Sequence, residues 1–360
     1  MPDNEMQYVR LGQSGLKISK IVFGCMSYGT PEWQKWVLDE EESMKHIMVA
    51  YDAGINAFDT ANVYSNGRSE IVLGKAIKKY NLDRDRIVVM TKVYFAVGDT
   101  PDFVSLGKTS EALDQAGYAN RRGLSRKHIF ESVKHSLARL QLDYVDLLQC
   151  AYLRILLPRQ AAYRFDMIGH RFDTETPIEE TMQALHDVVQ AGYVRYIGMS
   201  SCRAWQFHAM QNYAINNKLT PFISMQNHYN LVYREEEREM FPTLKYFNVG
   251  SIPWSPLARG LLTRPLSQQT KRGETDRMIK GYSPGEIVDR VEELAKKKGV
   301  TMAQIAFAWV ANRPGVSAPI VGATSLDNLK ELIAAINIKL SDEEVQYLEE
   351  TYTSRTLMGL

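Results

Sequence analysis

The chain has 360 residues, 45% of them hydrophobic, and 43 lysines and arginines against 42 acids give it a formal net charge of +1 at pH 7. This length suits one large α/β barrel, and because no linker or shift in composition marks a boundary, we expect a single domain over residues 1–360. The balanced charge excludes recognition of nucleic acid or anionic membranes by bulk charge, and no apolar run approaches the ~20 residues of a membrane span, which predicts a soluble, cytoplasmic protein.

The spacing of cysteines and histidines argues against disulfides and metal sites. Cys25, Cys150 and Cys202 form no C-x-x-C pair, which fits a reducing compartment. The sequence contains no H-x-x-x-H pair, and although His128 and His135 can share a helix face, an exposed pair on a basic helix is the commoner explanation. We therefore expect no metal.

Eight short apolar runs alternate with amphipathic segments along the chain. Before the first run, weak alternation around Gly12 and Gly15 predicts a small hairpin that plugs one end of a barrel. The apolar runs predict buried strands, because they are short and end at turn or polar residues. These strands are expected at residues 20–24, 55–58, 87–92, 143–149, 194–201, 222–226, 249–255 and 318–322.

The segments between the strands have apolar residues at helical spacing, and Ser125 is expected to cap one of them. Polar stretches at 97–123 and 257–283 predict irregular excursions. The glutamates at 235–237 and the lysines at 296–298 are expected to form solvated helix faces. The helices are expected at residues 41–54, 70–79, 125–140, 176–192, 204–217, 234–247, 285–299, 301–315, 325–336 and 341–350.

This order predicts an α/β fold, a (β/α)8 TIM barrel with an N-terminal hairpin and extra C-terminal helices. The main competitor is a doubly wound dinucleotide-binding fold. That fold uses a G-x-G-x-x-G turn after its first strand, and the chain contains no G-x-G. A P-loop is absent too, because the stretch at 107–109 lacks the earlier glycine of that motif.

Reactive groups of such a barrel collect at the carboxyl ends of its strands. The run at 55–58 stops at Asp59, Tyr64 follows in the next loop, and the neighbouring run ends at Lys92. Each residue has an ordinary explanation when taken alone: a turn cap, a half-buried ring or a solvated ammonium group. Together at adjacent strand ends they predict a site in which a lysine and its carboxylate partner perturb a phenol.

At this point the sequence resembles the aldo-keto reductase family over nearly its whole length. The resemblance rests on GINAFDTANVYSNGRSE, Thr91–Lys92, DYVDLLQ, VRYIGMSS, SMQNHYN, IPWSPLARG and APIVGATSLDNL. It implies NADPH-dependent reduction of a carbonyl, reversible as alcohol oxidation. Tyr64 would be the general acid, and Lys92, held by Asp59, would keep the pKa of the phenol low enough for proton transfer.

The resemblance also implies a set of cofactor contacts. Ser200, Ser201 and Gln226 match positions that hold the nicotinamide carboxamide, and Trp254 matches the aromatic residue on which the nicotinamide ring stacks. The family's pyrophosphate loop is matched by Ser255, Leu257 and Gly260. Its adenosine phosphate site, at a helix N-terminus, is matched by Gly322, Thr324, Ser325 and Asn328.

One departure concerns the choice between NADPH and NADH. The family usually carries a lysine or arginine near Ser325, where this chain has Leu326. The positive charge that would bind the extra phosphate of NADPH must then come from the helix N-terminus, Lys330 or Arg259. NADPH is expected, with NADH as the alternative.

A second departure concerns the histidine that orients the carbonyl oxygen in the family. Two positions after the LLQ stretch this chain has Ala151, and the matching histidine is His170, after an unusual insertion at residues 150–169. We predict His170 as the fourth catalytic residue, on condition that the insertion loops out and returns the chain to the strand end. The insertion is either a translated intron or a lid over the substrate mouth.

Aromatic side chains in the predicted loops favour a small aromatic or otherwise apolar carbonyl substrate. Those expected to face the pocket are Tyr28, Trp33, Tyr94, Phe95 and Tyr229. The alternative function is an NADPH-binding regulatory or inactive family member, disabled by the insertion before His170. A role in secondary metabolism is suggested by the type of relatives alone, and the natural substrate and oligomeric state stay open.

Overall fold

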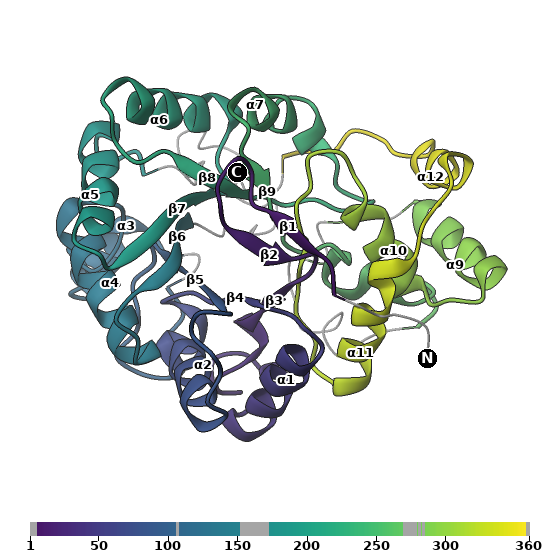
Figure 1. The fold of residues 1–360 in the computed structure, drawn as a ribbon, viewed down its shortest axis with the longest axis horizontal. Coiled ribbons are helices and arrows are strands. Elements are labelled where there is room, and N and C mark those ends of the chain that lie inside the picture. The colour runs from purple at the N-terminus through teal and green to yellow at the C-terminus, as the bar shows by residue number, and fades with distance from the viewer. Residues whose placement is uncertain are drawn as a thin grey trace.

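A computed structural model describes residues 6–105, 108–151, 173–268, 279, 282 and 285–357. Eight parallel strands form one sheet in the order β10-β3-β4-β5-β6-β7-β8-β9. Helices surround this sheet, and a two-stranded hairpin lies across its centre in the view of Figure 1. The predicted α/β barrel with an N-terminal hairpin is confirmed.

The strands follow the predicted apolar runs, one strand to each run. The hairpin consists of β1 (Tyr8–Arg10) and β2 (Lys17–Ser19), which are antiparallel. The barrel strands are β3 (Val22–Gly24), β4 (Ala57–Asp59), β5 (Val88–Val93), β6 (Val145–Ala151), β7 (Val194–Ser200), β8 (Phe222–Gln226), β9 (Gly250–Ser251) and β10 (Ile320–Val321).

Backbone hydrogen bonds close the sheet between β9 and the chain that leads into β10. The N–H of Ser317 donates to the Ser251 carbonyl at 2.7 Å, and the N–H of Ile320 donates to the Pro253 carbonyl at 2.8 Å. On its other side β10 pairs with β3, with Ile320 opposite Val22. Closure brings the carboxyl ends of all the strands to one rim, which is where parallel barrels place their sites.

The helices lie outside the barrel, and several begin at a side-chain cap. Ser125 accepts a hydrogen bond from the His128 N–H at the start of α4, as predicted, and Asp39 caps α1 in the same way. The helices are α1 (Glu40–Asp52), α2 (Arg68–Lys79), α3 (Ser110–Gln115), α4 (Arg126–Leu140), α5 (Ile178–Gln190), α6 (Ala204–Asn216), α7 (Met240–Phe247), α9 (Ile287–Lys298), α10 (Met302–Ala311), α11 (Leu326–Ala334) and α12 (Asp342–Glu349). Short 3-10 turns are η1 (Cys25–Ser27), η2 (Tyr64–Gly67), η4 (Glu235–Glu237), η5 (Ala258–Thr263) and η7 (Ala335–Asn337).

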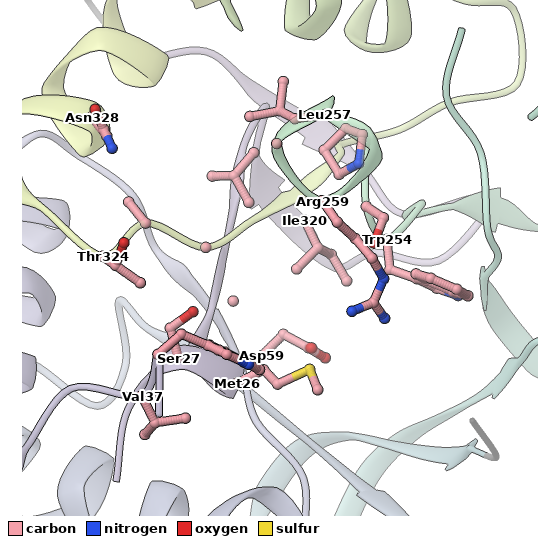
Figure 2. Close-up of a pocket in the computed structure, with 18 of the residues that line it drawn as sticks. Met26, Ser27, Val37, Asp59, Trp254, Leu257, Arg259, Ile320, Thr324 and Asn328 are labelled. Atoms are coloured by element: carbon pink, nitrogen blue, oxygen red, sulfur yellow. The ribbon is translucent and has the colours of Figure 1, made fainter. Parts of the chain in front are cut away.

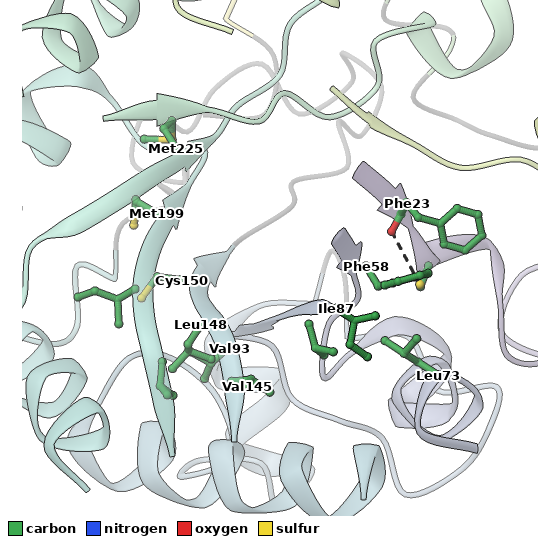
Figure 3. Packing of buried hydrophobic residues seen from close by; sticks show 14 of the residues in the cluster. Phe23, Phe58, Leu73, Ile87, Val93, Val145, Leu148, Cys150, Met199 and Met225 are labelled. Atoms are coloured by element: carbon green, nitrogen blue, oxygen red, sulfur yellow. Dashed lines mark hydrogen bonds between the residues drawn. The ribbon is translucent and has the colours of Figure 1, made fainter. Parts of the chain in front are cut away.

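Side chains along the barrel strands alternate between two cores, because residues two apart on a strand share a face. One core lies between strands and helices, and Figure 3 shows part of it, including Phe23, Phe58, Leu148, Met199 and Met225. The other fills the barrel interior and includes Val22, Ala57, Met90 and Leu147. This parity decides which rim residues point inward.

The hairpin closes one end of the barrel, as predicted. Leu11 and Ile18 are fully buried and belong to the interior core. Gly12, between the two strands, has a φ of +59°, and a Cβ there would lie 2.7 Å from the Asn248 carbonyl oxygen. The hairpin contacts the beginnings of the barrel strands, so the opposite end, at their carboxyl ends, is left for a site.

The segment 234–247 differs from its prediction as one helix. Residues Glu235–Glu237 form η4, and α7 begins only at Met240. Glu235 and Glu236 are buried, and Glu235 accepts hydrogen bonds from the Tyr352 hydroxyl at 2.7 Å and the Arg355 N–H at 2.8 Å. The expectation of a solvated face was wrong at these two positions, and at Glu235 the reason is its contact with the C-terminal segment.

Within the described residues, no helix has the length and apolar character to cross a membrane. The same part of the chain holds no group of three or more histidine, cysteine or acidic side chains arranged as metal ligands. Cys25, Cys150 and Cys202 are all buried.

We predict that Gly12→Ala destabilises the protein by about 1–3 kcal/mol, because alanine would be strained at this positive φ and would press on backbone atoms of the 248–250 segment. The measurement is the urea midpoint of unfolding, compared between variants whose unfolding free energy depends on urea concentration with the same slope. Gly15→Ala is the matched control, since a Cβ at Gly15 meets nothing within 4 Å. Equal urea midpoints for the two variants would contradict close packing of the hairpin against the barrel at Gly12.

Candidate active site

The inward-facing side chains at the carboxyl rim are polar, unlike the apolar layer beneath them. Asp59 on β4, Lys92 on β5 and Gln149 on β6 each come two positions after a side chain of the interior core. Gln226 joins them from the end of β8. All four side chains are buried, with exposed fractions between 0% and 4%.

These residues form one hydrogen-bonded network around the Asp59 carboxylate. The Lys92 ammonium lies 2.5 Å from Asp59 Oδ2 and donates to the Thr60 carbonyl at 2.8 Å. Asp59 Oδ1 accepts from the Gln149 amide at 2.8 Å and from the Gln226 amide at 3.0 Å. Both carboxylate oxygens are therefore occupied, and the carboxylate is fixed in place by side chains from three other strands, β5, β6 and β8.

The burial of Lys92 requires this arrangement, because an ammonium group without a partner is too costly to keep charged inside a protein. Burial by itself favours the neutral amine. The effects of Asp59 and Tyr64, which both favour the charged ammonium, together exceed the effect of burial, so the pKa of Lys92 lies above its ordinary value. The lysine is therefore a permanent positive charge at neutral pH.

Tyr64 stands beside this charge at the start of η2. Lys92 Nζ lies 4.9 Å from the centroid of the Tyr64 ring. The two residues after the tyrosine, Ser65 and Asn66, have φ values of 49° and 50°, a left-handed conformation that is costly for residues other than glycine. The backbone strain thus falls where the loop turns the phenol toward the lysine.

The pKa of the Tyr64 phenol is raised above its ordinary value. Burial is the largest cause, and Asp59 adds to it, while the charge of Lys92 acts in the opposite direction. The predicted lowering by Lys92 is present, but burial exceeds it. The phenol is therefore protonated over the whole neutral range.

A cavity of about 1130 Å³ opens above these groups. Asp59, Tyr64 and Lys92 lie in its wall, and Figure 2 shows Asp59 below the loop that carries Trp254 and Arg259. The cavity extends from there to Thr324 and Asn328 on the far side (Figure 2). It is larger than the ~300–1,000 Å³ typical of small-molecule pockets, so it has room for more than one small ligand.

Trp254 presents a flat ring in this wall, held by a stack of aromatic rings. His228 stacks on Trp254 with centroids 4.1 Å apart and an interplanar angle of 8°, and Tyr233 stacks on His228 at 4.3 Å and 13°. The indole N–H donates to the Ser201 hydroxyl at 2.9 Å. The stacking on His228 thus fixes the orientation of the indole plane, and the hydrogen bond to Ser201 fixes the rotation of the ring within that plane.

The loop that follows Trp254 is strained and lines the same wall. Ser255, Ala258 and Arg259 have φ values of 54°, 47° and 59°, and Gly260 has 99°. Such conformations persist only where surrounding structure holds them, and they concentrate at functional sites. The residues of this loop that line the cavity are Ser255, Pro256, Leu257, Arg259 and Gly260.

The far end of the cavity is formed at the start of α11. Gly322, Thr324 and Asn328 line it, and the Ser325 hydroxyl caps the helix by accepting from the Asn328 N–H at 3.2 Å. A helix N-terminus carries partial positive charge and exposed N–H groups, which suit a phosphate.

Most predicted cofactor positions line this cavity, whereas two are not part of the lining. Ser200, Gln226, Trp254, Ser255, Leu257, Gly260, Gly322, Thr324 and Asn328 line it. Ser201 instead holds the Trp254 indole, and Ser325 caps α11. Their contacts are with the lining rather than with the open space.

The aromatic residues predicted to bind substrate divide differently. Phe95 lines the cavity, while Trp33 is buried next to Tyr64, with ring centroids 6.4 Å apart, and Tyr94 packs edge-on against Phe95. Trp36, which sequence analysis did not single out, lines the cavity beside Trp33.

Two of the substrate-binding predictions are corrected. Tyr28 is fully buried in the core between strands and helices, where its hydroxyl donates to the Ala323 carbonyl at 3.0 Å. Tyr229 is buried in a separate cluster and donates to Glu237. Position in a loop after a strand did not distinguish rings that face the cavity from rings that anchor the loops in the core.

His170 and most of the insertion lie outside the described residues. The chain is described up to Ala151 on β6 and again from Asp173. Asp173 is buried and accepts from the Leu124 N–H at 2.6 Å. Burial, and after it the charge of Asp173, raises the pKa of the Cys150 thiol to about 12. The described chain thus resumes against the segment at Leu124, three residues after His170 in the sequence.

Two kinds of site residue were missed from the sequence, one buried beneath the cavity and the other in its lining. Gln149, which fixes Asp59, could have been found from strand parity, because it follows Leu147 by two positions. Lys35, Trp36 and Arg264 come from polar or irregular loops that carry no periodic signal, and the structure places them in the cavity lining.

Comparison with known proteins agrees with the fold. The model of the "Aldo/keto reductase family" matches residues 20–353. Versiconal hemiacetal acetate reductase of Aspergillus parasiticus is 49% identical, over 98% of this chain and 98% of its own length. A Saccharomyces cerevisiae protein with the provisional name aryl-alcohol dehydrogenase AAD16 is 44% identical over 96% and 97%, and aldo-keto reductase AFTS1 of Alternaria alternata is 43% identical over 98% and 93%. The chain therefore belongs to the aldo-keto reductase family, a family of oxidoreductases.

Proposed function

We propose that this protein reduces aldehydes or ketones with NADPH, with Tyr64 as the proton donor. The observation that carries the proposal is the position of a half-buried, protonated phenol beside the Lys92–Asp59 pair, in the wall of a cavity large enough for a dinucleotide and a small carbonyl compound. The family generally uses a nicotinamide cofactor, so the residues present must be able to hold one.

The cavity lining fits a nicotinamide dinucleotide along its whole length. Trp254 offers a fixed flat ring for stacking, and Ser200 and Gln226 offer polar groups next to it. The strained loop at 255–260 and the capped start of α11 offer backbone groups at two further points. When bound there, the reduced nicotinamide supplies hydride to the carbonyl carbon.

The chain's own residues then have to complete the reduction with a proton. Tyr64 donates it from its hydroxyl to the carbonyl oxygen as negative charge develops there. The neighbouring Lys92 ammonium stabilises the phenolate that remains, and Asp59 keeps the ammonium in place. Gln149 and Gln226 hold the carboxylate, so the whole set is fixed before substrate arrives.

We propose His170 as the residue that orients the carbonyl oxygen. The support is indirect: alanine at position 151 has no group that can donate, and Asp173, three residues after His170 in the sequence, is held by the Leu124 N–H and acts electrostatically on Cys150 in β6. A histidine in this position would complete a pocket with Tyr64.

The substrate we propose is an aromatic or otherwise apolar carbonyl compound. Near Tyr64 the described cavity wall is formed by Met26, Trp36, Val37 and Phe95. Rings and apolar chains of this kind bind planar, apolar ligands. The names of the relatives, a hemiacetal acetate reductase and an aryl-alcohol dehydrogenase, agree with this choice.

NADPH is favoured over NADH by the cations in the described lining, which are Lys35, Lys92, Arg259 and Arg264. Lys92 is paired with Asp59, and Arg259 lies 5.9 Å from the centroid of the Trp254 ring. Arg264 follows the strained loop and is exposed, so it is the candidate for the phosphate that distinguishes the two cofactors. Lys330, considered from the sequence, is exposed but outside the lining.

We predict that Tyr64→Phe lowers kcat for carbonyl reduction by about 10²–10⁴-fold, because it removes the proton donor while keeping the ring. The assay is NADPH oxidation with a panel of nitrobenzaldehydes. The dissociation constant for NADPH, measured by protein fluorescence, should stay within about threefold of the wild-type value. A wild-type protein that binds NADPH without turnover would instead support the regulatory alternative.

The raised pKa of Tyr64 predicts opposite pH dependence for the two directions. Reduction needs the protonated phenol, so kcat should be constant through the neutral range and fall only in alkali. Alcohol oxidation needs the phenolate, so its rate should rise toward high pH.

Removing the charges of Lys92 and Asp59 should move the alkaline rise in the oxidation rate to still higher pH, because Lys92 lowers the pKa of Tyr64 more than Asp59 raises it. We therefore predict that Asp59→Asn/Lys92→Met shifts the rise in oxidation rate to higher pH. The double change leaves no unpaired buried charge. Lys35→Met, which removes an exposed cation of the same cavity, is the control, and a shift to lower pH in the double variant would refute the assignment.

The charge assignment predicts that Arg264→Ala weakens NADPH binding by about tenfold or more, with little effect on NADH, because a charge-assisted hydrogen bond is lost. Lys35→Ala is the matched control, since Lys35 lies next to Trp36 at the Tyr64 end of the cavity. Fluorescence titration of the wild-type protein and both variants with each cofactor gives the dissociation constants. Equal weakening of NADPH and NADH would exclude Arg264 as the discriminating residue.

A further inference from the structure

The loops that follow β3 and β10 meet beside the cavity, and Tyr28 connects them. Tyr28 comes from the first loop, and its hydroxyl donates to the Ala323 carbonyl of the second at 3.0 Å. Gly322, the neighbour of Ala323, packs so closely that a Cβ would lie 3.3 Å from the Gly24 carbonyl oxygen and 3.4 Å from Ser27 Oγ. The loop after β10 therefore packs directly against the loop after β3.

A buried histidine determines the direction of this hydrogen bond. His46 Nδ1, on α1, lies 3.2 Å from the Tyr28 hydroxyl oxygen. The hydroxyl has one proton and the Ala323 carbonyl can only accept, so the proton on Tyr28 goes to Ala323 and Nδ1 must donate to Tyr28. Both contacts are satisfied only when His46 carries a proton on Nδ1.

The ring of Tyr28 leaves little freedom for this hydroxyl. It stacks on Phe23 with centroids 5.3 Å apart and an interplanar angle of 16°, and His46 meets it edge-on at 5.6 Å. Tyr28 and His46 are both fully buried. A small-molecule substrate in the cavity cannot contact them, so any effect on the reaction must pass through the loop that they hold.

We infer that Tyr28, oriented by His46, is a positioning residue for the cofactor-binding loop 322–325, and not a substrate-binding residue. Gly322, Ala323 and Thr324 line the far end of the cavity. The inference rests on the proposed function, because it assumes that the dinucleotide occupies this end. Losing the Tyr28 hydroxyl frees the Ala323 carbonyl, and the loop then has to be ordered when the cofactor binds.

The test is Tyr28→Phe in the full-length protein, because phenylalanine keeps the ring stack and removes the hydroxyl. The dissociation constant for NADPH, measured by protein fluorescence, should rise about three- to tenfold, as expected for one lost hydrogen bond. The KM for NADPH should rise with it, whereas kcat at saturating NADPH and the KM for the carbonyl compound should stay within twofold.

Tyr118→Phe is the matched control. Tyr118 is also buried, stacks on Phe103 with centroids 4.8 Å apart, and donates its hydroxyl to Asp99 at 3.3 Å, away from the cavity lining. It should lose stability like Tyr28→Phe but bind NADPH like the wild-type protein.

His46 provides a second, independent variant pair. Asparagine places an N–H donor near the position of Nδ1, whereas leucine has none. His46→Leu should therefore weaken NADPH binding as Tyr28→Phe does, and His46→Asn should restore most of the affinity. This comparison still decides the question if Tyr28→Phe fails to fold.

The outcomes separate this inference from the proposed function. A raised KM for the carbonyl compound with an unchanged NADPH constant in Tyr28→Phe would overturn the inference, and so would equal NADPH binding by Tyr28→Phe and the wild-type protein. A wild-type protein that does not bind NADPH would overturn the proposed function itself, and the inference with it.

Discussion

The structure depends on one buried ion pair at the carboxyl rim of the barrel. An ammonium group as buried as Lys92 stays charged only with a carboxylate in contact, and Asp59 provides it at 2.5 Å. The carboxylate in turn needs its remaining lone pairs satisfied, and the amides of Gln149 and Gln226 do this from two further strands. Four strands are thus tied to one charge, next to the phenol whose chemistry that charge supports.

Closure of the sheet makes this arrangement possible. In an open sheet the ends of β4 and β8 would be far apart, but the hydrogen bonds between the β9 and β10 segments join the two edges, so that Gln226 reaches Asp59 across the barrel interior. The hairpin fills the other end with apolar side chains such as Leu11 and Ile18. One end of the barrel is therefore sealed and apolar, and the other is polar and opens into the cavity.

The strained backbone of the site follows the same logic. Around the site, left-handed residues other than glycine occur after Tyr64, at Ser201 and in the loop at 255–260, all in segments that follow barrel strands. Each costs energy that the rigid barrel and the surrounding contacts offset. The corrected roles of Tyr28 and Tyr229 belong here, because both rings anchor loops in the core. Rigid support behind the lining is what keeps the cavity walls in place.

The sequence by itself determined the order of strands and helices, the eight-stranded barrel, and the placement of Asp59, Tyr64 and Lys92 at neighbouring strand ends, because hydrophobic periodicity and strand order are local properties of the chain. It did not determine which aromatic rings line the cavity, the burial of Glu235 under the C-terminal segment, or the net direction of the Tyr64 pKa. Only the tertiary structure decided these, since each depends on which distant segments pack against a side chain and how much water they exclude.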